Sequence, residues 1–235
     1  MIMVKEELVE RSPVRIFMNS IHGGLKAGEI GLIASPSGLG KTSVLVQIAL
    51  DRLLQGQKVI HVSFVKHTDH VLAWYEDIFD EFINKKNLEN KTEVKNDIVK
   101  NRVLMQFNQE GVTTDQIFGS IRAMIKDGHF NAECVIIDGY SFSGSDGGNM
   151  KRVKEYALEL GISIWYSCTV EGGAAYDKQN IPLIVKDYAD SFEVIIILEP
   201  RKEHIALTMS KDRNQRNPEH VALRLDPRTL LILKE

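Results

Sequence analysis

The sequence predicts an α/β fold in which a mostly parallel central β-sheet lies between two helical layers and ends in an antiparallel β meander. The first observation is that short runs rich in β-branched and aromatic residues alternate with helix-length segments up to about residue 168. Such alternation is typical of a parallel sheet that is covered on both faces. The second is that only short strand-like runs, separated by polar turns, follow after residue 190. This change of pattern indicates a terminal meander.

Each element follows from local composition. Strands are expected in the first part of the chain at 29–34, 59–64, 102–107, 134–138 and 162–167. Helices fit 43–50, 69–83, 114–127 and 149–160; Thr113 and Thr114 are candidate N-caps of the third, and Gly161 ends the fourth. The segment 84–101, rich in Lys, Asn and Glu, is expected to be a solvated connector or an exposed helix. The meander is expected to contain strands at 192–198, 204–209, 221–225 and 230–233.

Length and composition favour a single globular domain over residues 1–235, with 1–12 as a candidate N-terminal arm. The chain is 43% hydrophobic and 26% charged and has a formal net charge of −3, which gives no general attraction to nucleic acid or anionic membranes. No apolar run approaches the ~18 residues of a membrane span. The charged residues from Lys5 onward argue against a signal peptide, and Cys134 and Cys168 lie in apolar runs typical of reduced thiols. We therefore expect a cytoplasmic protein without a membrane partner.

A phosphate-binding loop is the strongest chemical signal. The stretch Ser35-Pro36-Ser37-Gly38-Leu39-Gly40-Lys41-Thr42 departs from the pattern G-x-x-x-x-G-K-[ST] only at its first residue. Gly38 and Gly40 allow successive N–H groups to converge on phosphate oxygens, and Lys41 supplies a charge for the β- and γ-phosphates. The predicted nucleotide-binding residues are Ser37, Gly38, Leu39, Gly40, Lys41, Thr42 and Ser43. The alternative, a Gly/Ser-rich surface turn, explains neither the strand before the loop nor the helix after it.

A carboxylate at the end of a later strand is the second signal. The run Val135-Ile136-Ile137-Asp138 would deliver a carboxylate to the sheet edge beside the phosphate loop. There it can hold the hydration shell of Mg²⁺, while the Thr42 hydroxyl contacts the ion. We therefore expect ATP and Mg²⁺ as cofactors, with Thr42 and Asp138 on the metal side. The alternative is that Asp138 only caps the following turn.

Three segments together resemble the RecA-like ATPases, most closely their DnaB-helicase and KaiC branches. They are the Gly-Gly-Leu-Lys-Ala-Gly-Glu run at 23–29 that leads into the phosphate loop, the helix-to-strand junction at 158–162, and the late Ser-Lys-Asp-Arg-Asn run at 210–214. The resemblance covers the chain from about residue 13. It implies a RecA-like three-layer sandwich that binds Mg·ATP.

The sequence departs from those families where hydrolysis is concerned. Their strand after the first helix ends in a Glu that activates water, whereas this chain has Val65 and Lys66 there. Cys168 stands where the helicase branch has a Gln that senses the γ-phosphate. Substitute bases are Asp69, His67 or His70, although each also suits an ordinary loop or helix start, and Asp69 suits an N-cap.

The resemblance also implies that Lys211 and Arg213 act in trans on the γ-phosphate of a neighbouring subunit. On a strand, residues i and i+2 point the same way, so both cations would reach one target. The alternative is a solvated basic strand edge. The expected assembly is a homo-oligomer, either a hexamer or a filament, or a complex with an unknown protein partner.

Two functions therefore compete. One is a nucleotide-dependent switch or assembly scaffold with weak or absent hydrolysis; the other is an active ATPase, a helicase or remodelling motor on single-stranded nucleic acid. In this fold nucleic acid binds the loops at 140–148 and 169–178, which contain one Lys, no Arg and three carboxylates. DNA affinity requires several cations, so a nucleic-acid partner is not expected. Tyr140, Phe142 and Tyr176 could stack on bases, or pack down onto the domain.

Overall fold

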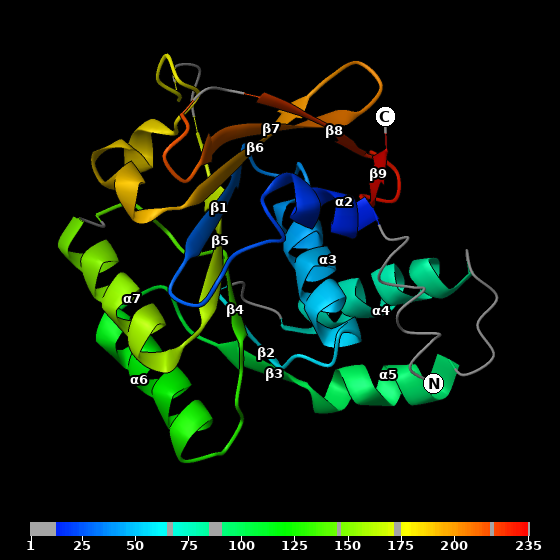
Figure 1. Cartoon of the computed structure of the whole chain (residues 1–235), viewed down its shortest axis with the longest axis vertical. Coiled ribbons are helices and arrows are strands. Elements are labelled where there is room, and N and C mark those ends of the chain that lie inside the picture. The colour runs from blue at the N-terminus through cyan, green and yellow to red at the C-terminus, as the bar shows by residue number, and fades with distance from the viewer. Residues whose placement is uncertain are drawn as a thin grey trace.

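The computed structural model describes residues 13–64, 68–84, 91–144, 147–171, 175–216 and 219–234. Within them a nine-stranded sheet has the order β3-β2-β4-β5-β1-β6-β7-β8-β9. The strands from β3 to β6 in this order are parallel, and β7, β8 and β9 continue the sheet in antiparallel pairs (Figure 1). The bounds are β1 Ile30–Ser35, β2 Val59–Ser63, β3 Arg102–Gln106, β4 Cys134–Asp138, β5 Ser163–Thr169, β6 Val194–Pro200, β7 Ile205–Asp212, β8 Glu219–Leu225 and β9 Ile232–Lys234. The predicted fold class is confirmed.

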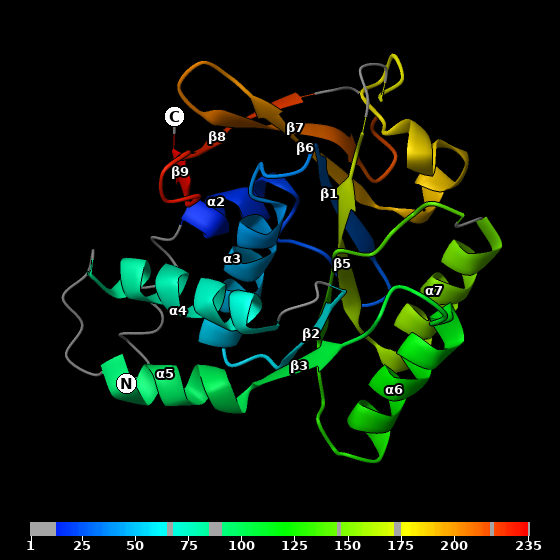
Figure 2. The same ribbon diagram turned by 180° about the vertical axis from the view of Figure 1, so that it is seen from behind.

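Helices form a layer on each face of the sheet. Figures 1 and 2 show α2, α3, α4 and α5 on one side and α6, α7 and η1 on the other. The bounds are α2 Pro13–Ser20, α3 Lys41–Leu54, α4 Thr68–Asn84, α5 Lys91–Lys100, α6 Thr114–Lys126, α7 Gly147–Leu160 and the 3₁₀ helix η1 Leu183–Ser191. Two hydrophobic cores result, because both faces of the parallel strands are buried. None of the helices in these ranges is both long and apolar enough to cross a membrane.

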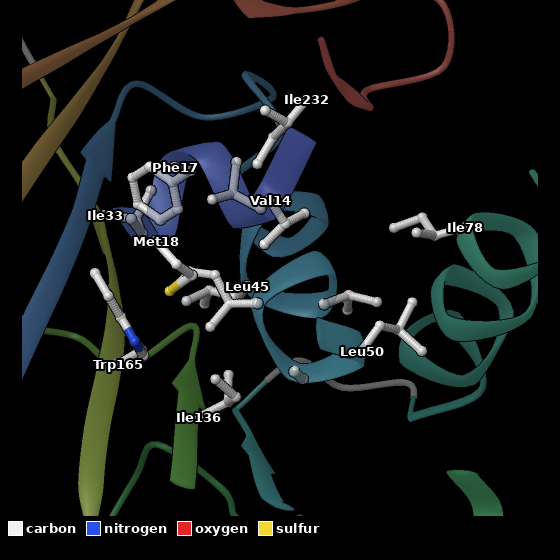
Figure 3. Close-up of a cluster of buried hydrophobic side chains, with 14 of the residues drawn as sticks. Val14, Phe17, Met18, Ile33, Leu45, Leu50, Ile78, Ile136, Trp165 and Ile232 are labelled. Atoms are coloured by element: carbon white, nitrogen blue, oxygen red, sulfur yellow. The ribbon is translucent and has the colours of Figure 1, made fainter. Parts of the chain in front are cut away.

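The centre of the first core is tightly packed. Figure 3 shows Phe17 and Met18 of α2 lying with Leu45 of α3 above Trp165 on β5. Trp165 is fully buried, and a Cβ on Gly31 of the neighbouring strand β1 would come within 2.5 Å of its ring. Only glycine fits there. The strands beneath the phosphate loop therefore pack against α2 and α3 without spare room.

Most elements lie where the sequence predicts them, with differences of a few residues at the ends. Thr113 is the N-cap of α6 and forms a capping box with Gln116. Gly161 follows α7 with a φ of +66°, as expected of a C-terminal glycine.

Three short helices add detail to the predicted pattern. The polar segment 84–101 contains α5, a mostly exposed helix, which agrees with one of the two expectations for this segment; Val94 and Ile98 are its buried residues. Two apolar side chains at an i, i+4 spacing suffice to attach this helix to the core. The helices α2 and η1 were not predicted, because α2 has only eight residues and η1 is a nine-residue 3₁₀ helix interrupted at Tyr188, so each carries little periodic signal.

Candidate nucleotide-binding site

The phosphate loop connects the fully buried strand β1 to α3. Gly38 and Gly40 have φ values of +80° and +90°, which L-residues with side chains rarely adopt. Apart from its chain neighbours, no described residue has an atom within 4 Å of a Cβ added to Gly38, so that side of the loop is open. Gly40 precedes α3, which has no side-chain N-cap. The N–H groups at this helix end therefore have no side-chain cap, an arrangement suited to anions.

Lys41 lies folded back over the loop. Its Nζ donates to the carbonyl oxygens of Ser35 and Pro36 at 3.1 and 2.9 Å. The Ser35 hydroxyl lies 3.3 Å from the same ammonium, so the residue that departs from the loop pattern contributes to this contact. Burial lowers the pKa of Lys41, while Cys168 and Asp138 act in the opposite direction. A phosphate would supply the negative charge that this buried cation lacks.

Thr42 and Asp138, 96 residues apart, meet at the sheet edge. The Thr42 hydroxyl donates to Oδ2 of Asp138 at 2.8 Å, and the Ser167 hydroxyl donates to Oδ1 at 2.6 Å. The backbone N–H of Gly139 donates to the Ser167 oxygen at 2.8 Å. The Asp138 carboxylate is therefore oriented through both oxygens. Hydroxyl and carboxylate oxygens are ligands that Mg²⁺ prefers, so these side chains suit the ion expected from the sequence.

A buried histidine lies on the same face of the sheet, one strand away from Asp138. His61 on β2 is fully buried, and its Nδ1 is 3.1 Å from the Tyr75 hydroxyl of α4. The guanidinium of Arg102 lies 4.1 Å from the centre of the Tyr75 ring. Burial lowers the pKa of His61 to about 4, with Asp138 opposing and Arg102 reinforcing the effect. His61 is therefore neutral at pH 7.

The residues expected to catalyse hydrolysis are only partly described. Val65, Lys66 and His67 lie outside the described residues. Asp69 and His70 are exposed in the first turn of α4. Because α4 begins at Thr68, Asp69 lies inside the helix and does not precede it as an N-cap would.

Cys168 is fully buried on β5. Burial raises the pKa of its thiol to about 12, although the Lys41 charge opposes this. A neutral, buried thiol is a poor substitute for the amide that the helicase branch has at this position.

Lys211 and Arg213 lie at the opposite edge of the sheet from the phosphate loop, because β7 runs antiparallel to β6 and β1. Lys211 is buried, and its Nζ donates to the carbonyl oxygens of Ala189, at 3.0 Å, and Phe192. The Arg213 guanidinium donates to Glu29 at 3.1 Å and to Asp212 at 2.6 Å.

Among the described residues the two cations share no target, so the expectation that they point the same way is not met. The strand β7 ends at Asp212, and Arg213 has a φ of +51°. The alternation of side chains along a strand therefore stops before Arg213. Both cations have partners within the chain, Lys211 on backbone carbonyls and Arg213 on acidic side chains.

The loops after β4 and β5 border a cavity of about 470 Å³ at the carboxyl edge of the sheet, with η1 on its third side. Phe142 is 3% exposed and lies in a cluster with Tyr140, Tyr166 and Phe192. Tyr176 is half-buried. The loop aromatics thus pack onto the domain, as the alternative to base stacking predicts.

Sequence reasoning placed Ser35 in the loop without a role, and it missed Ser167 and His61 as parts of this region. A serine in a strand carries no signal by itself. The alternation of β5 places Ser167 on the face of Trp165, and that of β2 places His61 on the face of the buried Val59. This pattern could have located both residues.

The strand order, the phosphate loop and the contact between Thr42 and Asp138 define a RecA-like P-loop fold of the kind found in ATPases. The ATPase domain of G40P shares it, with a TM-score of 0.66 and 13% identity over 93% of this chain and 89% of that one. The predicted RecA-like fold is thereby confirmed.

A sequence relative supports the same class. Over 45 residues, 19% of this chain, the sequence is 47% identical to the DNA repair protein RadA of Aquifex aeolicus (strain VF5). The match covers 10% of the length of RadA. No family model matches the chain.

Proposed function

We propose that this chain binds Mg·ATP and acts as a nucleotide-dependent switch or assembly scaffold with weak or absent hydrolysis. The observation that carries the proposal is the convergence of Lys41, Thr42 and Asp138 around an open glycine loop at a helix N-terminus. Each of these groups has a separate role toward a metal-bound triphosphate. The loop N–H groups and Lys41 bind phosphate oxygens. Thr42 and Asp138 hold Mg²⁺, which neutralises phosphate charge when bound.

The test of nucleotide binding is Lys41→Ala, with Lys126→Ala as the control because Lys126 is exposed on α6. We expect Lys41→Ala to remove most Mg·ATP affinity in a titration, since it deletes the phosphate-facing cation, and to leave the circular dichroism spectrum unchanged. The control should bind as the native protein does. Unchanged affinity in a folded Lys41→Ala protein would refute the assignment.

Weak hydrolysis is supported by the absence of a carboxylate at positions 65 and 66. Loss of a general base costs a factor of ~10²–10⁴ in rate. We expect Val65→Glu to raise the turnover of Mg·ATP. Val65→Gln should leave turnover low, because the Gln side chain has the shape of Glu but is not a base. Fast turnover by the native protein would show that another group serves as the base.

The second candidate is a motor on nucleic acid, which the name of the relative, a DNA repair protein, favours. Against it stand the loops at 140–148 and 169–178, with a single Lys, and the packing of Phe142 into the domain. Turnover measured with and without single-stranded DNA separates the two functions. Stimulation by DNA would establish the motor.

Assembly through Lys211 and Arg213 is the least direct part of the proposal. Cations at one sheet edge and the phosphate loop at the other favour head-to-tail contacts, which close into rings or continue as filaments. We expect Mg·ATP to increase the mass measured by light scattering for the native protein but not for Arg213→Ala. Arg122→Ala, which breaks an exposed ion pair with Glu159 on α6 and α7, is the control. A monomer in saturating Mg·ATP would remove the trans role.

A further inference from the structure

Gln47 joins the phosphate-loop helix to the end of the sheet. Its side chain lies fully buried in the second turn of α3, six residues after Lys41. Nε2 donates to the Leu230 carbonyl oxygen at 3.0 Å, and Oε1 accepts from the Ile232 N–H at 2.9 Å. One end of the amide is thus bonded to the segment that links β8 to β9, and the other end to the first residue of β9.

Ser43 also bonds to the carbonyl oxygen of Leu230 that Gln47 contacts. Its hydroxyl donates to the Leu230 carbonyl oxygen at 2.7 Å, and the Gln47 Nε2 lies 3.2 Å from the Ser43 oxygen. Leu230 has a φ of +54°, an unfavourable conformation for a branched residue. The two donors from α3 therefore hold Leu230 in a backbone state that it would not adopt by itself.

The segment 226–231, here called the C-terminal turn, is a compact unit. The Asp226 carboxylate accepts from the Arg228 N–H at 2.8 Å, and the Leu230 N–H donates to the Asp226 carbonyl oxygen at 2.7 Å. The Asp226 N–H donates to the Leu231 carbonyl oxygen at 3.0 Å. Displacement of Leu230 would therefore disturb the whole turn.

The C-terminal turn also touches the phosphate loop. A Cβ on Gly40 would lie 3.3 Å from a methyl group of Leu225 and 3.4 Å from one of Leu230. Lys41 and Thr42 are therefore flanked by contacts with the C-terminal turn or its preceding residue Leu225, at Gly40 before them and at Ser43 after them. Any movement of the loop on binding a phosphate would reach the turn directly.

We propose that Gln47 is a positioning residue that fixes the C-terminal turn against the phosphate loop and so couples nucleotide binding to the order of the terminal β meander. Gln47 acts through Ser43 and Leu230 and touches no phosphate. The inference rests on the proposed binding of Mg·ATP. By linkage, if the turn strengthens nucleotide binding, the nucleotide stabilises the turn to the same extent.

The experiment compares Gln47→Met, which keeps the volume but has no amide, with Ile121→Ala, a destabilising change in the opposite core. Mg·ATP affinity is measured by titration, and hydrogen exchange is followed at the Ile232 amide, which bonds to Gln47. We expect Gln47→Met to weaken Mg·ATP binding at least tenfold and Ile121→Ala by less than twofold. Mg·ATP should slow exchange of the Ile232 amide in the native protein and not in Gln47→Met.

A second variant covers a failure of Gln47→Met to fold. Leu230→Gly removes the side chain that touches Gly40 at a half-exposed position where glycine adopts the positive φ freely. It should also weaken Mg·ATP binding and abolish the ATP-dependent protection of Ile232. Native-like affinity in either folded variant, or no effect of Mg·ATP on Ile232 exchange in the native protein, overturns the coupling alone. No Mg·ATP binding by the native protein overturns the proposed function and the coupling with it.

Discussion

Replacing His61 by Gln should change how the stability of the protein depends on pH. Burial lowers the pKa of His61 to about 4 from an ordinary value of 6.5. Between these values the unfolded chain binds a proton that the folded protein does not. Stability is therefore fully present above pH 6.5 and is lost as the pH falls toward 4.

The magnitude follows from the two pKa values. Their separation corresponds to about 3 kcal/mol of unfolding free energy, because each tenfold change in proton affinity is worth about 1.4 kcal/mol. About 2 kcal/mol of this is lost between pH 7 and pH 5, where most carboxylates remain ionised. Solvent does not screen the charge of a protonated His61 in the folded protein, since the side chain is fully buried. Around it lie Tyr75, Asp138 and Arg102, and burial holds the pKa of Tyr75 well above its ordinary value.

Urea unfolding at pH 7, 6 and 5 measures the effect. The native protein should lose about 2 kcal/mol more than His61→Gln over this range, because Gln can still meet the Tyr75 hydroxyl but has no proton to gain. The difference between the two proteins removes the contribution of all other titrating groups. Equal losses would show that His61 is not held neutral by burial, and the reasoning would fail.

Two further predictions concern packing and thiol chemistry. Gly31→Ala should destabilise the protein by about 1–3 kcal/mol in urea unfolding, because its Cβ would come within 2.5 Å of the Trp165 ring; Trp165→Leu in the same chain should recover part of the loss, and additive effects would contradict the proposed clash. Cys134 and Cys168 should not react with a thiol reagent at pH 8 in the native protein and should both react in urea, because burial raises both pKa values. Rapid labelling of the folded protein would show that one of these strands opens.

The sheet was predictable because its signal is local. Buried parallel strands need unbroken apolar runs, and Val135-Ile136-Ile137 is such a run between an unpatterned loop and a carboxylate. The loop at 35–42 was predictable for a different reason, since its glycines and Lys41 are constrained by phosphate chemistry. The contact between Thr42 and Asp138 then followed from the rule that parallel strands end at one edge.

Features that depend on long-range contacts were not predictable. α2 is short, and the burial of its Phe17 and Met18 depends on Trp165, which lies in the same core 147 residues or more later in the chain. The left-handed backbone at Arg213 arises where its guanidinium meets Glu29, 184 residues earlier in the chain. Likewise, Gln47 looks like an ordinary helix residue until Leu230 is brought next to it by the end of the sheet.

The phosphate loop and Arg213 lie at opposite edges of the sheet, and the length of β1 sets the distance between them. Strand β1 joins the two edges, from the Glu29 that pairs with Arg213 to Ser35 at the loop. Six residues of strand span about 20 Å, roughly twice the distance over which charges influence one another in physiological salt. Solvent-exposed charges at the two edges are therefore largely screened from each other. An effect of bound phosphate at the opposite edge would therefore depend on displacement of β1, which packs closely against the Trp165 ring at Gly31.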